Sequence, residues 1–228
     1  MIIERRSADR GHVSFGWLDS RHTFSFGDYY DPRHMGWSAL RVINDDRVEG
    51  LRGFGMHPHR NMEILTVMLE GELTHRDSMG HQETLRAGEY QLMSAGRGVM
   101  HSEMNQAQEA AVLLQIWLQP DILNSEPGYQ QKRFPQTSGM TLIASPEGRD
   151  ESLTLRQQAS VWRIRAAAGE SLTLPLLHGA HAWLHVIAGA VSVAGCLHRG
   201  GDALGVRDEK HLTLAVKEDC DLLYFDLP

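Results

Sequence analysis

Short apolar runs separated by turn residues recur along the whole chain, and they are rich in leucine, β-branched and aromatic side chains. The clearest runs cover residues 38–45, 62–69, 111–118, 182–189 and 221–228. Several glycines lie between the runs, among them Gly71, Gly80, Gly88, Gly189 and Gly195. A long amphipathic helix is hard to find. Because short apolar runs between turn signals are typical of strands, the pattern predicts an all-β sandwich or barrel.

The two halves of the chain show a weak internal similarity. At residues 69–74 an apolar run ends in a glycine and then resumes, and the same order recurs at residues 187–192. Residues 121–134 contain proline and many polar side chains, so we expect a short helical or irregular linker there. The sequence therefore predicts two domains, residues 1–120 and residues 121–228.

The composition narrows the functions to consider. With 42% hydrophobic residues, a chain of 228 residues is long enough for one large β domain or two small ones. The net charge of −7 repels phosphate backbones and no cluster of Lys and Arg offsets it, so we expect no direct nucleic-acid partner. No run approaches the roughly 20 apolar residues of a membrane helix, and the N-terminal residues do not form a secretion signal. We therefore expect a cytoplasmic protein with no membrane partner.

The chain has two cysteines, Cys196 and Cys220, and neither lies in a C-x-x-C pair. They are therefore weak candidates for metal ligands. A single disulfide stays open at this point, although reduced thiols suit the expected compartment better.

Histidines at positions i and i+2 mark the first candidate site. His57 and His59 flank Pro58, and Glu63 follows them. Side chains alternate between the faces of a strand, so both imidazoles point the same way and can reach one ion. Pro58 has no N–H for a sheet ladder, so this strand should begin here or lie at a sheet edge.

A second pair has the same spacing. His101 and Glu103 follow two glycines, Gly96 and Gly98, that allow a tight turn into a strand. Together with the first pair they supply three nitrogens and one carboxylate oxygen, a set that suits Fe(II), Mn(II), Ni(II), Cu(II) or Zn(II). One such pair among 13 histidines can arise by chance. Two pairs separated by a strand–turn–strand unit favour a metal site.

The other histidines lack that arrangement, and we interpret most of them as surface or hydrogen-bonded groups. His75 and His81 flank a hairpin turn that residues 77–80 predict. No role in the candidate metal site follows from their positions.

Several longer segments resemble the pirins, a family of cupins. The matching segments are residues 22–26, 29–32, 40–46, 57–63, 77–80 and 93–103. The resemblance covers the whole chain and is strongest in residues 10–120. It implies a bicupin with two antiparallel β-barrel (jelly-roll) domains, of which the N-terminal one binds the metal ion. In pirins the ligands are three His and one Glu, which fall here on His57, His59, His101 and Glu103.

The resemblance also implies roles around the ion. Glu63, at the position of an acidic ligand in many other cupins, is expected to orient a ligating imidazole by hydrogen bonding. Aligning the two halves puts Pro175 and Leu177 opposite the first histidine pair, and neither residue binds a metal. The C-terminal cupin domain is therefore expected to lack metal ligands and to be structural.

Bacterial pirins resemble quercetin 2,3-dioxygenases, so the resemblance implies cleavage of a flavonol by O2 with release of CO. Glu103 then acts as the general base for the flavonol 3-hydroxyl, and Fe(II) is the ion we expect first. Phe24, Phe26 and Phe54 are pocket candidates that can stack on a flat substrate, although such residues often belong to the core. Gln115 is a further pocket candidate whose role is open. The expected partners are a small aromatic substrate and O2, and we expect a monomer.

Two other functions fit the same ligands. Eukaryotic pirins resemble transcriptional co-regulators that respond to the redox state of iron, so a metal-dependent sensor acting through a protein partner is the main alternative. Cupins also host other small-molecule reactions, such as isomerisation, because a fold does not fix a function. Loss of quercetin with CO release by the iron-loaded protein distinguishes the dioxygenase from both.

Overall fold

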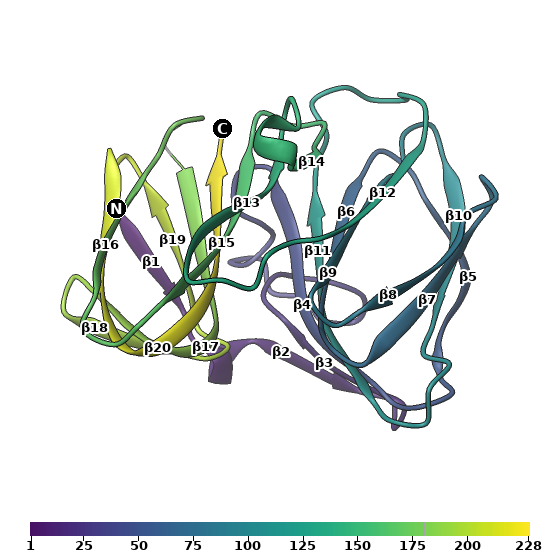
Figure 1. Ribbon diagram of the computed structural model, residues 1–228, viewed down its shortest axis with the longest axis horizontal. Helices are drawn as coiled ribbons and strands as arrows, with labels where there is room; N and C mark the ends of the chain where they lie inside the picture. The colour runs from purple at the N-terminus through teal and green to yellow at the C-terminus, as the bar shows by residue number, and fades with distance from the viewer. Residues whose placement is uncertain (180) are drawn as a thin grey trace. The chain divides into compact units, whose positions relative to one another are not determined.

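The computed structural model describes residues 1–179 and 181–228, and its regular structure is nearly all β (Figure 1). The helical elements of these residues are two short 3-10 turns, Ser7–Asp9 and Arg149–Glu151. Neither turn is long and apolar enough to cross a bilayer. The predicted all-β class is confirmed.

Two compact units divide the chain. Unit 1 consists of Met1–Arg10 with Pro135–Pro228, and unit 2 consists of Gly11–Phe134. Residues 121–134, which we placed with the C-terminal domain, thus lie in unit 2, while the first ten residues lie in unit 1.

Unit 2 contains one seven-stranded and one four-stranded antiparallel sheet. The larger sheet has the strand order β12-β9-β6-β11-β4-β3-β2, with the bounds Gly128–Arg133, Glu89–Ser94, Glu63–Glu70, Ala111–Leu118, Leu40–Val48, Leu18–His22 and Gly11–Ser14. The smaller sheet has the order β5-β10-β7-β8, with the bounds Gly53–His59, Val99–Met104, Glu72–Asp77 and Gln82–Arg86. Both are jelly-roll sheets with free edges, so the expected barrel is not closed by strand pairing among the described residues.

Three of the predicted apolar runs form the middle of the seven-stranded sheet, as β4, β6 and β11. Their apolar side chains are buried against the smaller sheet. Met68 and Leu113 from the larger sheet share one core cluster with Leu73 and Leu85 from β7 and β8. The burial of these faces, which removes apolar area from water, holds the two sheets of unit 2 together.

Unit 1 contains a nine-stranded sheet with the order β1-β19-β17-β20-β15-β13-β14, while β16 pairs with β20 and β18 pairs with β17. In chain order the bounds are Ile2–Arg5, Gly139–Ser145, Leu153–Thr154, Ser160–Ala166, Ser171–Pro175, His181–Val193, Cys196–Arg199, Ala203–Arg207 and His211–Leu227 for β1 and β13 to β20. Figure 1 shows β1, in purple, beside the yellow-green β19, with which it pairs from Ile2 to Arg5. The runs 182–189 and 221–228 contribute to the buried β17 and β20.

The expected linker at residues 121–134 is partly wrong. Its second half forms β12, which pairs antiparallel with β9 from Gly128 to Arg133. Without β12, β9 would be an edge strand with unpaired main-chain N–H and C=O groups. The main-chain groups of this polar segment form hydrogen bonds with them. Backbone pairing therefore overrides the loop tendency of the proline and polar residues.

Gly71 and Gly189, the two glycines of the internal similarity, both have a positive φ, +72° and +78°. Gly71 ends β6 before β7 begins, whereas Gly189 lies within the long strand β17. A Cβ at Gly189 would overlap the main-chain oxygen of Asp219, so glycine is required there by space as well as by φ.

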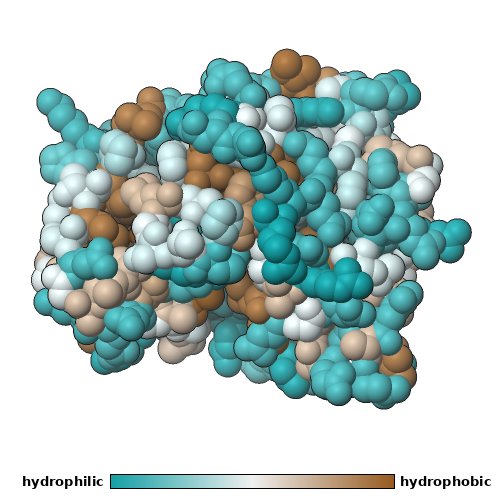
Figure 2. Space-filling view, viewed as in Figure 1, coloured by the Kyte–Doolittle hydropathy of each residue, from teal (hydrophilic) through white to brown (hydrophobic). Residues whose placement is uncertain are grey.

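The surface drawn in Figure 2 is mostly hydrophilic on the face shown, with scattered hydrophobic residues. Both cysteines are free thiols; Cys196 is exposed and Cys220 is buried. The single disulfide left open by the sequence is therefore absent from the described residues.

Candidate metal centre

The candidate site lies on the four-stranded sheet of unit 2, where residues of β10 lie opposite residues of β5 and β7. On β10, His101 lies opposite His57 of β5 on one side and opposite Asp77 of β7 on the other. Two residues further on, Glu103 lies opposite His75 of β7. Side chains of directly opposed residues project to the same side of a sheet with their Cβ atoms roughly 4.5–5.5 Å apart. The pairing therefore brings His57, His101 and Asp77 side by side across three strands. It also places Glu103 beside His75.

Three imidazoles form the first cluster. The ligand nitrogens of His57, His59 and His101 lie within 4.8 Å of one another. The ring centroids are 4.8 Å apart for His57 and His59, 4.4 Å for His57 and His101, and 4.8 Å for His59 and His101. Strand β5 is an edge strand, as predicted from Pro58, which has no N–H for a sheet ladder.

A second cluster shares His101 with the first. Ligand atoms of His75, His101 and Glu103 also lie within 4.8 Å of one another, and all three residues are buried. Gln115 of β11 donates from Nε2 to both carboxylate oxygens of Glu103, at 3.2 and 2.9 Å, and Thr66 donates to Gln115 Oε1 at 2.8 Å. These hydrogen bonds fix the direction of the Glu103 carboxylate.

Burial and mutual repulsion keep the imidazoles of His59 and His101 neutral. Burial, and then the neighbouring His57, lower the pKa of His59 to about 4. Burial, followed by the other histidines, also strongly lowers the pKa of His101. Burial raises the pKa of Glu103 to about 7, against the opposing effect of the Gln115 hydrogen bond. Neutral imidazoles present the lone pairs that a metal ion needs.

The hydrogen bonds of the cluster fit a metal ion. His57 Nδ1 lies 2.7 Å from the Gly55 carbonyl oxygen, which can only accept, so Nδ1 carries the proton and Nε2 keeps its lone pair. His101 Nε2 is buried without a hydrogen-bond partner. A buried polar atom left unpaired costs free energy, and a bound ion would satisfy it. Three imidazoles with a nearby carboxylate suit a borderline divalent transition metal.

A cavity of about 60 Å³ lies beside the cluster. Its walls include His57, His59, Glu103 and Gln115, so the first histidine pair and Glu103 line one common space. Phe26 and Phe54 line this cavity and also a neighbouring pocket of about 160 Å³.

The pocket walls combine aromatic rings with unpaired acceptors. Trp117 contacts His59 edge-on, with ring centroids 4.8 Å apart, and Phe26 contacts Trp117 at 5.2 Å. Ser20 Oγ and Asn44 Oδ1 are buried without hydrogen-bond partners, and both residues line the larger pocket. Such a pocket suits a flat, apolar ligand that carries hydroxyl donors.

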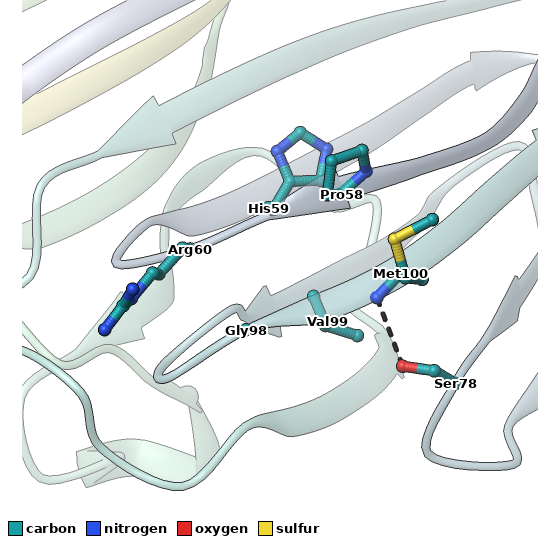
Figure 3. Close-up of a pocket in the computed structure, with 7 residues that line it drawn as sticks. All are labelled: Pro58, His59, Arg60, Ser78, Gly98, Val99 and Met100. Atoms are coloured by element: carbon teal, nitrogen blue, oxygen red, sulfur yellow. Dashed lines mark hydrogen bonds between the residues drawn. The ribbon is translucent and has the colours of Figure 1, made fainter.

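A larger depression of about 460 Å³ lies over the His59 end of β5 and the start of β10 (Figure 3). Figure 3 shows Pro58 and His59 on one strand, Arg60 just beyond its end, and Val99 and Met100 on the next strand. His59 contributes to this depression and to the small cavity, so its imidazole lies where the two spaces approach each other.

Two further candidates, Phe24 and Glu63, line neither of these two pockets. Phe24 is 2% exposed and belongs to the core rather than to the walls of either pocket. Glu63, at the start of β6, accepts a hydrogen bond from Ser94 Oγ at 2.7 Å and belongs to neither metal-ligand cluster among the described residues.

Two residues beside the cluster were not predicted as part of the site: His75 was expected only to flank a hairpin turn, and Asp77 only to form part of that turn. The turn at residues 77–80 does join β7 to β8, but both side chains are buried beside His101. The i, i+2 spacing that singled out His57 and His59 is also present here, as His75 and Asp77. That signal was available and would have placed both side chains on one face.

An all-β fold of two units, with a histidine cluster on adjacent strands of one unit, defines a two-domain protein of the cupin class. The sequence model for pirins matches residues 4–118, and the model for the quercetinase C-terminal cupin domain matches residues 142–227. The chain therefore belongs to the pirin family.

Relatives match along the full chain. The quercetin 2,3-dioxygenase of Escherichia coli is 44% identical over 229 residues, which cover 100% of this chain and 99% of the relative. A pirin-like protein of Caulobacter vibrioides is 37% identical over 230 residues, 99% of each chain. The crystal structure of the bacterial pirin YhhW from Escherichia coli in complex with nickel(II) has a TM-score of 0.97 at 44% identity, covering 100% of this chain and 99% of that chain.

Proposed function

We propose that this chain is a metal-dependent dioxygenase that cleaves flavonols such as quercetin with O2 and releases CO. The observation that carries the proposal is the cluster of His57, His59 and His101, of which His57 and His59 line the same cavity as Glu103. The names of full-length relatives and the nickel(II) complex of one 44% identical structure support it. The proposed ligands are the three histidines and Glu103.

When bound, a divalent ion supplies Lewis acidity that lowers the pKa of a flavonol hydroxyl placed against it. Glu103 accepts the proton of the 3-hydroxyl, because its carboxylate faces the cavity and is held there by Gln115. The deprotonated flavonol is electron-rich and is the form that O2 attacks. Burial of Glu103 and of His101 excludes water from this proton transfer.

The aromatic walls hold the flat substrate. Phe26 and Phe54, which line both the cavity and the larger pocket, stack on the flavonol ring systems. Ser20 Oγ and Asn44 Oδ1 accept hydrogen bonds from phenolic hydroxyls that reach the larger pocket. The chemistry of this pocket thus favours a polyphenol over an unsubstituted aromatic.

The test is aerobic incubation of iron-loaded protein with quercetin. Loss of the flavonol absorbance together with released CO supports the dioxygenase. His59→Ala is the matched control, because it removes one proposed ligand and should abolish turnover. If the wild type holds its ion but does not consume quercetin, while it captures a protein partner only in one redox state, the proposal is wrong and a sensor replaces it.

We further propose Fe(II) as the ion, a monomer as the working state and the cytoplasm as its compartment. Metal analysis of protein purified without an affinity tag tests the first, and light scattering tests the second. Zinc or nickel at one equivalent, with no iron, would refute the choice of ion. The C-terminal cupin domain is proposed to be structural, because both metal-ligand clusters of the described residues lie in unit 2.

A further inference from the structure

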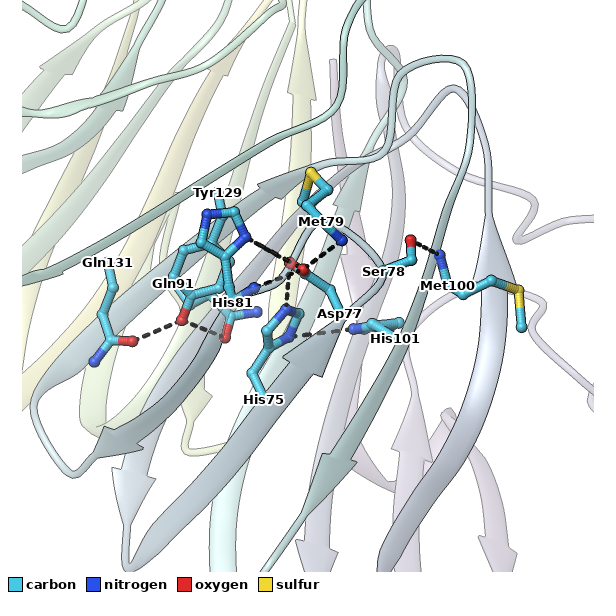
Figure 4. Close-up of polar contacts among 10 residues, drawn as sticks. All are labelled: His75, Asp77, Ser78, Met79, His81, Gln91, Met100, His101, Tyr129 and Gln131. Atoms are coloured by element: carbon cyan, nitrogen blue, oxygen red, sulfur yellow. Dashed lines mark hydrogen bonds and ion pairs between the residues drawn. The ribbon is translucent and has the colours of Figure 1, made fainter.

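Buried hydrogen bonds connect His101 of β10 to His75 and Asp77 of β7, on the side of β10 opposite to β5 (Figure 4). His101 Nδ1 lies 3.3 Å from His75 Nδ1, and His75 Nε2 lies 3.0 Å from Asp77 Oδ2. His101 is 0% exposed and His75 is 1% exposed, so water does not substitute for these partners. The geometry leaves each ring nitrogen of His75 with one partner.

The direction of each hydrogen bond follows from the Asp77 end. Asp77 Oδ1 accepts the main-chain N–H groups of Met79 and His81, at 2.9 and 3.1 Å, as expected of a carboxylate. A carboxylate only accepts, so His75 Nε2 must carry a proton and donate it to Asp77. Neutral imidazole has one N–H, so His75 Nδ1 accepts, and His101 Nδ1 must be the donor. The remaining nitrogen of His101, Nε2, then has its lone pair free.

We propose that Asp77 and His75 are positioning residues that fix His101 in its Nδ1–H tautomer and aim its Nε2 lone pair at the metal ion. The inference rests on the proposed metal centre. A ligating histidine commonly donates its second N–H to a carboxylate or carbonyl, which fixes both the tautomer and the ring orientation. Here an intervening imidazole carries that effect from Asp77 to His101.

This assignment also decides between the two ligand clusters. Both ring nitrogens of His75 are engaged, one by Asp77 and the other by His101. His75 therefore has no lone pair left for an ion, although its nitrogens lie close to those of His101 and to Glu103. The ion is directed to the side of His57 and His59.

Tyr129 of β12 covers this chain of hydrogen bonds. Its ring packs against His75, with centroids 4.8 Å apart, and stacks on His81 at 4.9 Å and 19°. His81 also contacts Asp77, with Nδ1 3.0 Å from Oδ2, but its side chain is 41% exposed. His81 thus shares the carboxylate with His75 but makes no hydrogen bond or ring contact with His101 among the described residues, which makes it a matched control.

Nitrogen NMR of metal-free protein labelled with 15N-histidine tests the inference directly. We expect His101 to show a protonated Nδ1 and an unprotonated Nε2, and His75 to show the reverse. A protonated Nε2 on His101 would overturn the inference. This measurement needs neither turnover nor bound metal, so it remains decisive even if the proposed dioxygenase activity fails.

Ni(II) titration of variants gives the second readout. His75→Leu removes the acceptor for His101 Nδ1–H, and the dissociation constant for Ni(II) should rise about 10–100-fold. His75→Gln restores an acceptor for His101 and a donor to Asp77, and should recover most of the affinity. His81→Leu should leave it unchanged. Thermal melts of the metal-free variants establish that each one is folded.

Equal Ni(II) affinity in His75→Leu and the wild type would refute the positioning role. So would an equal loss of affinity in His75→Gln, in which the acceptor is replaced, or in His81→Leu. A wild type that fails to bind Ni(II) would refute the metal centre itself, while the tautomer measurement still judges the hydrogen-bond chain.

Discussion

The hydrogen bonds of Gln115 to Glu103 and Thr66 give a quantitative prediction for the stability of the folded protein. It donates to both oxygens of Glu103 at 3.2 and 2.9 Å and accepts from Thr66 at 2.8 Å, all in the buried interior. Gln115→Leu removes a hydrogen bond to a charged group, worth about 1.5–3 kcal/mol, and leaves a buried hydroxyl unpaired, at about 1–3 kcal/mol. Added apolar burial offsets part of this, so we expect a net loss of about 3 kcal/mol in the free energy of unfolding.

Urea unfolding of the metal-free protein, followed by tryptophan fluorescence, measures this loss. In thermal melts it corresponds to a midpoint lowered by about 6–12 °C for a chain of this size. The pH dependence of the unfolding free energy tests the Glu103 hydrogen bond more specifically. Burial raises the pKa of Glu103 from 4.5 to about 7 in the folded state, so the wild type loses stability as the pH rises through that window.

Without the Gln115 hydrogen bond the folded-state pKa of Glu103 rises further, and the loss of stability continues to higher pH. The difference between wild type and variant should therefore grow above about pH 7. Thr66→Val is the control, because it leaves Gln115 bound to Glu103 and should cost only about 1 kcal/mol without that growth. A Gln115→Leu effect below about 0.5 kcal/mol, or one equal at low and high pH, would refute the reasoning.

Three further predictions concern Glu103 of the candidate site and two residues of unit 1, Asp202 and Gly189. In Glu103→Gln most of the bound metal should remain, while kcat for quercetin falls about 10²–10⁴-fold, as expected on loss of a general base; full activity would contradict the assignment. Burial raises the pKa of Asp202, but hydrogen bonds from Ser7 N–H and other N–H donors lower it overall. Asp202→Asn should therefore lower the thermal midpoint at neutral pH, and the gap to the wild type should close as the pH falls below about 4. Gly189→Ala should cost about 2–4 kcal/mol of unfolding free energy, because it adds an overlap to an unfavourable φ, whereas Gly195→Ala, with nothing within 4 Å, should cost about 1–2 kcal/mol by urea unfolding.

The sequence alone determined the features that depend on neighbours along the chain. The alternation of side chains on a strand put His57 and His59 on one face, and the missing N–H of Pro58 placed their strand at an edge. Short apolar runs predicted the strands of the core, and residues 77–80 predicted the turn between β7 and β8. Period and turn chemistry are local properties, so they can be inferred before any strand has a partner.

Only the tertiary structure decided which strands became neighbours. The pairing of β10 with β7 put Asp77 opposite His101 and His75 opposite Glu103, and thereby gave two turn-flanking residues a place beside the candidate metal centre. The pairing of β12 with β9 turned an expected linker into a strand. Backbone hydrogen bonds are the same for every residue type except proline, so they carry little sequence information. Strand order and register instead follow from which apolar faces can be buried together across the whole unit.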